Sequence, residues 1–198
     1  MKLILASGSP RRRELLSELG YSFDVCPADF DESTVDLSTP EDGVQALAAG
    51  KAHASLEALK KSGADVSGTV FLGSDTVVVH GGAVLGKPAD KEDAKRMLKM
   101  LSGDVHKVCT GTAFVTENGT GTDVSVTEVY FYDLSDEEID RYIASGEPMD
   151  KAGAYGIQGL GRTLVRKIDG DYFTVVGLPV AETYRKLLKY GIKPLPIL

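Results

Sequence analysis

The chain has 198 residues, of which 42% are hydrophobic and 26% charged, a balance typical of a globular protein and not of a disordered or fibrous one. The net charge of −7 argues against a general nucleic-acid binder, because binding to a polyanion depends on summed positive charge. No apolar run approaches the roughly 18 residues that span a bilayer, and Cys26 and Cys109 lack metal-ligand spacing. We therefore expect a cytoplasmic protein of one domain, without a membrane or nucleic-acid partner.

The first stretch, residues 3–13, is an apolar run followed by two serines, a proline and three arginines. It predicts a buried strand and then a helix, with Ser9 as N-cap and Pro10 at the first helical position. Arg11 and Arg12 lie in the first turn, where the helix dipole disfavours cations. Either an anion such as a phosphate chain binds here, or the turn is merely solvated.

A short strand over residues 22–27 precedes an acidic loop with Asp29, Asp31 and Glu32. Such a loop could hold a divalent cation, although most acidic loops are only solvated. The next helix begins at residue 40, and Lys51 lies on its apolar side. An ammonium group on that side either extends past the edge of the face or reaches into a polar site.

Residues 66–72 predict an apolar strand, and Asp75 follows it closely, as expected at the carboxyl end of a strand in an open α/β sheet. Asp75 is the best single catalytic candidate; the alternative is a turn aspartate that bonds its own backbone. A hairpin turn is expected at residues 81–82. If that hairpin folds back, Lys87 ends near Asp75; otherwise it is a surface lysine.

Further hairpins are predicted for the second half of the chain. The first joins residues 106–116 to 122–133 through Asn-Gly, with an apolar alternation that includes Val124 and Tyr130. The second joins residues 163–168 to 172–176 through Asp-Gly. We expect helices after Asp90, after the capping box at residues 135–138, and near the C-terminus.

The glycine-rich residues 150–161 predict a flexible, ligand-sized loop that carries Gln158. They match neither the phosphate loop nor the dinucleotide fingerprint, so glycine content alone is weak support.

Five motifs in order resemble the Maf family of nucleoside triphosphate pyrophosphatases. They lie at residues 7–12 (Ser-x-Ser-Pro-Arg-Arg), 73–76, 86–88, 101–103 and 150–159. The resemblance covers nearly the whole chain and implies one domain, 1–198, of the inosine triphosphate pyrophosphatase-like α/β class. That class has an elongated mixed sheet with flanking helices and two lobes around a cleft.

The resemblance also implies a site for a nucleoside triphosphate substrate. The residues that it places in the cleft are Ser7, Ser9, Arg11, Arg12, Glu32, Lys51, Asp75, Thr76, Lys87, Asp150, Lys151 and Gln158. Asp75 would activate water or share a divalent metal, Mg²⁺ or Mn²⁺, with Glu32. Lys51 and Lys87, together with the arginines, would hold the phosphate chain during hydrolysis to the monophosphate and pyrophosphate.

Members that act on dTTP and UTP resemble this sequence at Arg11, Thr76 and Gln158. An amide such as that of Gln158 can pair with the imide edge of uracil or thymine. Two alternatives stay open: a 7-methyl-GTP pyrophosphatase, and a nucleotide-sensing regulator of septum formation. The family also implies a homodimer and a role in nucleotide-pool sanitation, with a possible role in cell-division arrest.

Overall fold

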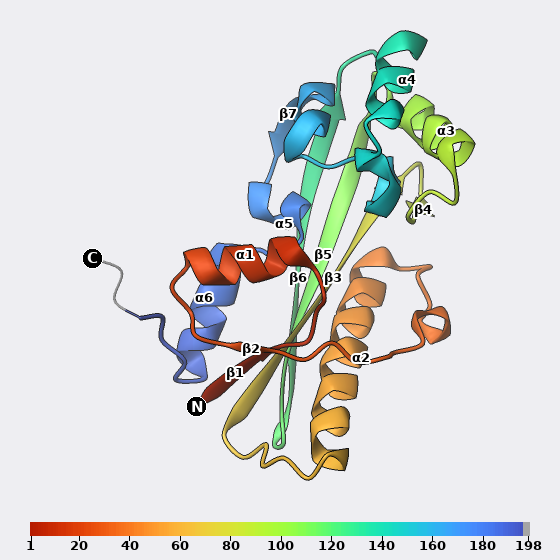
Figure 1. Cartoon of the computed structure of the whole chain (residues 1–198). Coiled ribbons are helices and arrows are strands. Elements are labelled where there is room, and N and C mark those ends of the chain that lie inside the picture. Colours follow the sequence, from red (N-terminus) through yellow and green to blue (C-terminus); the bar gives the residue numbers. More distant parts are fainter. Residues whose placement is uncertain (196–198) are drawn as a thin grey trace. The chain divides into compact units, whose positions relative to one another are not determined.

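The structure is a computed structural model that describes residues 1–195, and these residues form two compact units (Figure 1). Unit 1 contains Met1–Asp75, Thr110–Ser125 and the chain from Gly177 onward. Unit 2 contains Thr76–Cys109 and Val126–Val176. Each unit therefore combines segments that are distant in sequence.

The elements follow one another along the chain as a mixture of strands, α-helices and short 3₁₀ helices (η). They are β1 (Lys2–Leu5), α1 (Pro10–Glu18), β2 (Asp24–Val25), η1 (Glu32–Thr34), α2 (Pro40–Lys61), β3 (Thr69–His80), β4 (Ala83–Leu85), α3 (Lys91–Leu101), β5 (Val105–Thr116), β6 (Gly119–Phe131), α4 (Asp136–Ala144), η2 (Glu147–Asp150), η3 (Ala152–Ala154), η4 (Gly159–Leu164), β7 (Val165–Asp169), α5 (Tyr172–Val176) and α6 (Val180–Lys189).

The strands form a seven-stranded mixed sheet in the order β2-β1-β3-β5-β6-β7, with β4 paired to β3. β1 is parallel to both of its neighbours, β2 and β3. β4 pairs antiparallel with β3, and β7 pairs antiparallel with β6. The predicted mixed α/β sheet with flanking helices is confirmed.

Strand β3 is longer than the sequence predicted. Its parallel pairing with β1 ends at Leu72, but the strand continues to His80 and pairs with β4 from Val78. The expectation that Asp75 follows the carboxyl end of a strand was therefore wrong. Asp75 lies within β3, between the two ladders, because the valines after it extend the strand.

Unit 1 has a core in which α2 packs directly on the sheet. Ala48 and Ala52 of α2 belong to the same buried apolar cluster as Phe71 of β3. A Cβ atom at Gly73 would lie 2.0 Å from the Ala48 carbonyl oxygen, and one at Gly111 would lie 2.3 Å from that of Val44. The helix backbone thus contacts the strand backbones where the sequence supplies glycine.

Unit 2 has its own core, in which α3 and α4 pack against the sheet. His106 of β5 lies within it, 2% exposed, and its ring meets those of Phe131 and Tyr155 edge to face. Nε2 of His106 lies 2.8 Å from the Tyr155 hydroxyl oxygen. Burial lowers the pKa of His106 to about 4, so the ring is neutral near pH 7.

This buried histidine should make stability depend on pH. The folded-state pKa of His106 lies below its unfolded value of 6.5, so the unfolded state binds more protons between pH 6.5 and 4. We expect wild type to lose about 2 kcal/mol through this group between pH 7.5 and 5.0. Denaturant unfolding at both pH values should give a smaller pH-dependent loss for His106→Gln than for wild type. The exposed His53→Gln control should keep the wild-type dependence.

The second predicted hairpin was wrong in its second arm. β7 pairs with β6, and the residues that follow the Asp-Gly turn form α5 instead of a strand. The Asp171 carboxylate accepts the backbone N–H groups of Phe173 and Thr174, at 3.3 and 3.1 Å, and so starts a helix. This local cap outweighs the β-propensity of the Val175-Val176 pair.

The predicted apolar alternation of β6 marks the more exposed face. Tyr132, just beyond the strand, is 52% exposed, whereas Val129 and Phe131 are buried in the core of unit 2. Both faces of this strand carry apolar residues, so period-two alternation could not identify the inner one.

The predicted helix starts are confirmed in position. Asp90 caps α3, and Ser135 with Glu138 forms the complete capping box of α4. Ser9 is the N-cap of α1, but the hydroxyl oxygen that accepts a backbone N–H there belongs to Ser7. Among the described residues, none of the helices has the length and apolar character to cross a bilayer.

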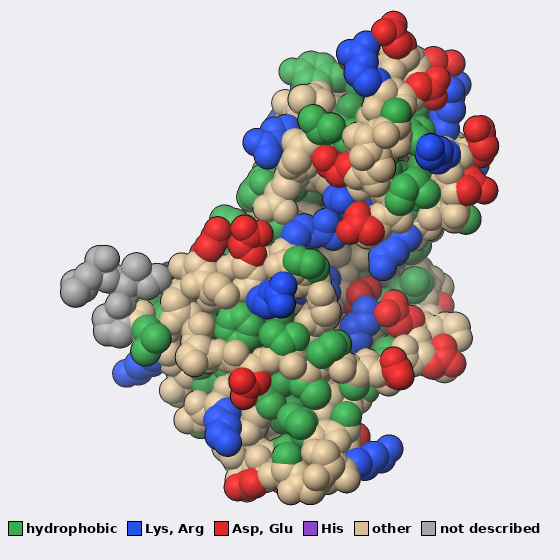
Figure 2. All heavy atoms as spheres, viewed as in Figure 1, with side chains coloured by type: hydrophobic (Ala, Val, Ile, Leu, Met, Phe, Trp, Pro, Cys, Tyr) green, Lys and Arg blue, Asp and Glu red, His purple; other side chains and the backbone are tan. Residues whose placement is uncertain are grey.

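The visible surface mixes charges of both signs. Figure 2 shows Lys and Arg side chains interspersed with Asp and Glu, without a continuous field of one sign on this face. The basic residues that follow β1 must therefore act over short distances.

Candidate active site

Lys51 of α2 joins two carboxylates in unit 1. Its Nζ lies 2.5 Å from Oδ1 of Asp75 and 3.0 Å from Oε1 of Glu32. The side chains of Lys51 and Asp75 are 19% and 14% exposed, whereas Glu32 is 57% exposed. The Lys51 ammonium group therefore reaches into a polar site, which was one of the two alternatives for a lysine on an apolar helical face; it does not simply extend past the edge of that face.

Arg12 is fixed next to this group by the turn that opens α1. Its Nε donates to the Gly177 carbonyl oxygen at 2.8 Å, and Nη1 donates to the Ser7 hydroxyl oxygen at 3.2 Å. Ser74 of β3 donates to the same Gly177 carbonyl at 3.0 Å. The guanidinium group is therefore held by a hydroxyl from the segment between β1 and α1 and by a carbonyl from the segment before α6, and β3 bonds that same carbonyl.

The electrostatics of Arg12 reflect this position. Burial lowers the pKa of its guanidinium, and the negative charges of Asp75 and Glu32 oppose that change. Arginine stays protonated in proteins, so the start of α1 carries a fixed positive charge beside two carboxylates. Arg11 is half-buried, while Arg13 is exposed. Such an arrangement suits a phosphate chain, which meets guanidinium and hydroxyl donors together.

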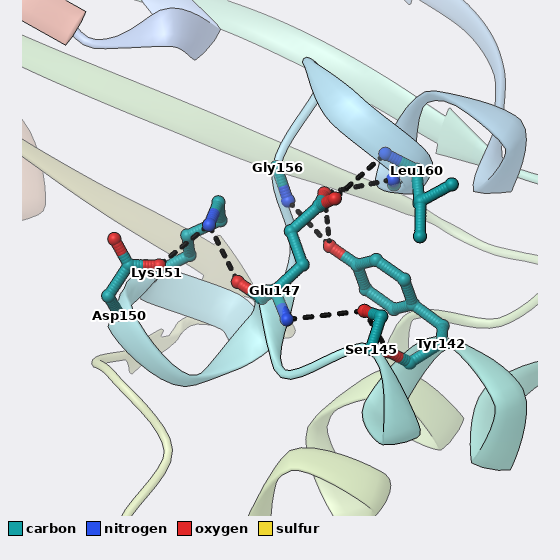
Figure 3. Close-up of polar contacts among 8 residues, drawn as sticks. Tyr142, Ser145, Glu147, Asp150, Lys151, Gly156 and Leu160 are labelled. Atoms are coloured by element: carbon teal, nitrogen blue, oxygen red, sulfur yellow. Dashed lines mark hydrogen bonds and ion pairs between the residues drawn. The ribbon is translucent and has the colours of Figure 1, made fainter.

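The second group of predicted residues lies in unit 2, on a loop that follows α4 (Figure 3). Lys151 donates from Nζ to the Asp150 carboxylate and to the Glu147 carbonyl oxygen, both at 2.6 Å. Gln158 is half-buried and precedes η4. The loop is not an open glycine loop: it contains three 3₁₀ helices, and Tyr155 and Ile157, between the second and the third, are buried.

Two predicted residues lie on or near the β3–β4 hairpin of unit 2. Thr76 is half-buried on β3, and Lys87 is exposed two residues after β4. The hairpin itself is confirmed, with Val78 opposite Leu85. The approach of Lys87 to Asp75 stays a prediction.

Asp75 and Glu32 are the residues that could hold a divalent metal. Both carboxylates point at one ammonium group, so they already converge on a shared cation. Mg²⁺ is commonly bound through one or two carboxylates together with substrate phosphates, and this donor set fits that pattern. Over residues 1–195, three or more His, Cys, Asp or Glu side chains do not gather into a metal-binding group. Substrate oxygens would have to complete the coordination.

Several residues that build these groups were missed from the sequence. The Gly177 carbonyl, which holds Arg12, carries no side-chain signal. Glu147 lies on η2 and Tyr142 on α4, and the sequence predicted no role in the site for either residue. Ser74 was quoted within its motif but given no role, although its hydroxyl is fully buried.

Comparison with known proteins decides the family. The family model described as Maf-like protein matches residues 2–190. The chain belongs to the Maf family.

Three Maf relatives are each named dTTP/UTP pyrophosphatase. The one from Hahella chejuensis is 48% identical over 97% of this chain and 94% of its own length. That from Bacillus pumilus is 48% identical over 98% of both chains, and that from Bacillus anthracis is 46% identical over 96% of both. The Maf similarity therefore includes both units.

Proposed function

We propose that this chain hydrolyses dTTP and UTP to the monophosphate and pyrophosphate. The observation that carries the proposal is the Lys51 ammonium joined to Asp75 and Glu32 beside the half-buried Arg12. The relatives of the chain that are named dTTP/UTP pyrophosphatase support it. Hydrolysis at the α-phosphorus needs an oriented water and stabilisation of the charge on the departing pyrophosphate. The cluster in unit 1 contains groups suited to both tasks.

Asp75 is the proposed base that orients water and accepts its proton. Lys51 and Arg12, with Arg11, Lys87 and the hydroxyls of Ser7 and Ser9, would bind the phosphate oxygens through charge-assisted hydrogen bonds. Glu32 and Asp75 would hold a Mg²⁺ or Mn²⁺ ion, which supplies charge neutralisation on the phosphates when it is bound.

The loop in unit 2 is the proposed binding site for the nucleobase of the substrate. The Gln158 amide would donate to a carbonyl and accept from the N–H of a uracil or thymine edge. Thr76, Asp150 and Lys151 are proposed to contribute to nucleotide binding. The whole chain, 1–198, would act as one two-lobed domain.

The experiment that tests the reaction is a substrate panel. Pure protein is incubated with Mg²⁺ and with dTTP, UTP, modified pyrimidine triphosphates, 7-methyl-GTP, GTP and ATP, while pyrophosphate and orthophosphate are measured separately. Pyrophosphate release that is fastest with dTTP and UTP supports the proposal. Faster turnover of 7-methyl-GTP supports the alternative of a 7-methyl-GTP pyrophosphatase. Binding of dTTP without turnover supports the alternative of a nucleotide-sensing regulator.

Changing Gln158 to glutamate should alter base preference. The carboxylate keeps the length of the side chain but lacks the amide donor, and one lost hydrogen bond in a matched polar pocket costs about 1 to 3 kcal/mol. We expect kcat/KM for dTTP and UTP to fall by roughly 10-fold or more, with little change in Tm. A Gln45→Glu variant on α2 is the matched control. An unchanged substrate profile in Gln158→Glu would refute the proposed base contact.

We further propose a cytoplasmic homodimer that clears unwanted pyrimidine triphosphates, with arrest of cell division as a consequence of that activity. Light scattering on the pure protein would test the dimer. Complementation with wild type and with the inactive Asp75→Asn variant would show whether the division phenotype needs catalysis.

A further inference from the structure

Glu147 lies at the centre of the polar contacts that close the loop in unit 2 (Figure 3). Its Oε2 accepts the backbone N–H of Leu160 at 2.8 Å, and its Oε1 accepts that of Gly161 at 3.0 Å. Oε1 also accepts the Tyr142 hydroxyl at 3.0 Å. One carboxylate from η2 therefore bonds two backbone N–H groups of η4 and the side chain of α4.

The charge state of this carboxylate follows from those contacts. Burial raises the pKa of Glu147, but hydrogen bonds from Leu160, Gly161 and Tyr142 outweigh burial and keep the pKa below its ordinary value. Glu147 is therefore ionised at neutral pH and acts as an internal anion at the start of a short helix.

The space around the carboxylate is closely fitted. A Cβ at Gly159, where φ is +63°, would lie 2.5 Å from Oε2 of Glu147. A Cβ at Gly161 would lie 2.2 Å from the Gly156 carbonyl oxygen and 2.6 Å from the Tyr142 hydroxyl. The glycines of the motif allow the loop backbone to approach Glu147 and Tyr142.

These contacts bracket Gln158 on both sides. Gly156, two residues before it, donates its N–H to the Tyr142 hydroxyl at 3.2 Å, and Leu160, two residues after it, donates to Glu147. The main-chain carbonyl of Glu147 also accepts Nζ of Lys151 at 2.6 Å. Glu147 thus bonds Lys151 directly and, together with Tyr142, holds the backbone on both sides of Gln158.

We propose that Glu147 is a positioning residue for base selection: its carboxylate orders residues 156–161, so that Gln158 is presented to the pyrimidine in one orientation. This inference rests on the proposed function for its substrate. The contribution is pre-organisation, because a loop that is ordered before binding loses less entropy when the nucleotide arrives.

The test is Glu147→Gln, which keeps size but turns one acceptor into an N–H donor facing an N–H donor. The matched control is Glu137→Gln on α4, whose side chain is 84% exposed and paired with Arg141. We expect the ratio of kcat/KM for dTTP over GTP to fall by roughly 10-fold in Glu147→Gln and to stay unchanged in Glu137→Gln. Inhibition by tripolyphosphate, which has no base, should change by less than about 2-fold.

A purely structural role would lower turnover of dTTP and GTP together and weaken tripolyphosphate inhibition, and that result would overturn the proposal. Should Glu147→Gln fold poorly, Tyr142→Phe removes one of the three bonds to the carboxylate and the bond to Gly156. It should shift the dTTP-over-GTP ratio in the same direction; an unchanged ratio in a folded Tyr142→Phe would equally count against the proposal.

Two measurements keep this inference separate from the proposed reaction. Amide hydrogen exchange at Leu160 and Gly161 should be at least about 10-fold faster in Glu147→Gln than in wild type. Unchanged exchange would refute the proposal that the Glu147 carboxylate orders residues 156–161. If wild type hydrolyses no triphosphate, the proposed function fails. The affinity ratio of dTMP over GMP then decides the role of Glu147, because a ratio that the variant leaves intact rejects it.

Discussion

Replacing Asp75 with asparagine is expected to lower kcat for dTTP by roughly 100-fold or more. Asparagine keeps the shape of the side chain and an oxygen that can accept from Lys51, which lies 2.5 Å from the carboxylate. It cannot accept a proton from water at neutral pH, so the proposed chemical step loses its base. Binding of dTTP should persist, since Arg12 and Lys51 remain.

Single-turnover kinetics with excess enzyme would separate the chemical step from binding in this variant. Asp65→Asn is the control, because Asp65 is an exposed carboxylate that bonds Ser67 in the loop before β3. It should retain wild-type turnover. Normal turnover in Asp75→Asn would remove Asp75 from the mechanism and leave the Lys51 cluster without its proposed base.

Replacing Gly73 with alanine is expected to destabilise the fold by about 3 kcal/mol or more, because the added methyl group overpacks a rigid contact. The new Cβ would lie 2.0 Å from the Ala48 carbonyl oxygen, and α2 would have to move away from β3. For a chain of this length the Tm should fall by roughly 10 °C. Activity of the folded fraction should also fall, since Lys51 moves with α2.

Gly86→Ala provides the comparison for the melting experiment. Among the described residues a Cβ at Gly86 would meet no heavy atom within 4 Å, and φ there is not left-handed. Its Tm should remain within about 2 °C of wild type, as for an ordinary surface change. Equal melting of wild type and Gly73→Ala would mean that α2 is not seated on β3 as described.

Local signals in the sequence predicted local structure well. Pro10, Asp90 and Ser135 lie at helix starts because capping and fixed φ act over a few residues. The position of Lys51 on an apolar helical face left two alternatives open, and the structure has the one in which its ammonium group reaches a polar partner, Asp75. In each case the deciding interaction lies within one element or between charged side chains that stand out in an apolar segment of the sequence.

Other features were missed or misjudged, because either two local signals competed or the deciding contact joins distant parts of the chain. The segment after the Asp-Gly turn has strand composition, but the Asp171 cap made it a helix. The contact of Arg12 with the Gly177 carbonyl joins residues 165 positions apart through a main-chain atom, which no composition or spacing encodes. The role of Glu147 could not be recognised from the sequence, because an acidic residue between a glycine and a proline is usually only part of a turn.

The segmented composition of unit 1 has a consequence for synthesis on the ribosome. Arg12 emerges among the first residues, but the Gly177 carbonyl that holds it belongs to the last segment of the unit. The hydrogen bond between the Gly161 N–H and the Glu147 carboxylate, by contrast, joins residues only 14 positions apart. Nascent chains that lack the final helix can therefore form the Glu147 contacts early, whereas Arg12 gains its Gly177 partner only late in synthesis. A chain stalled before Gly177 also lacks Leu187 of α6, which is fully buried in the folded unit.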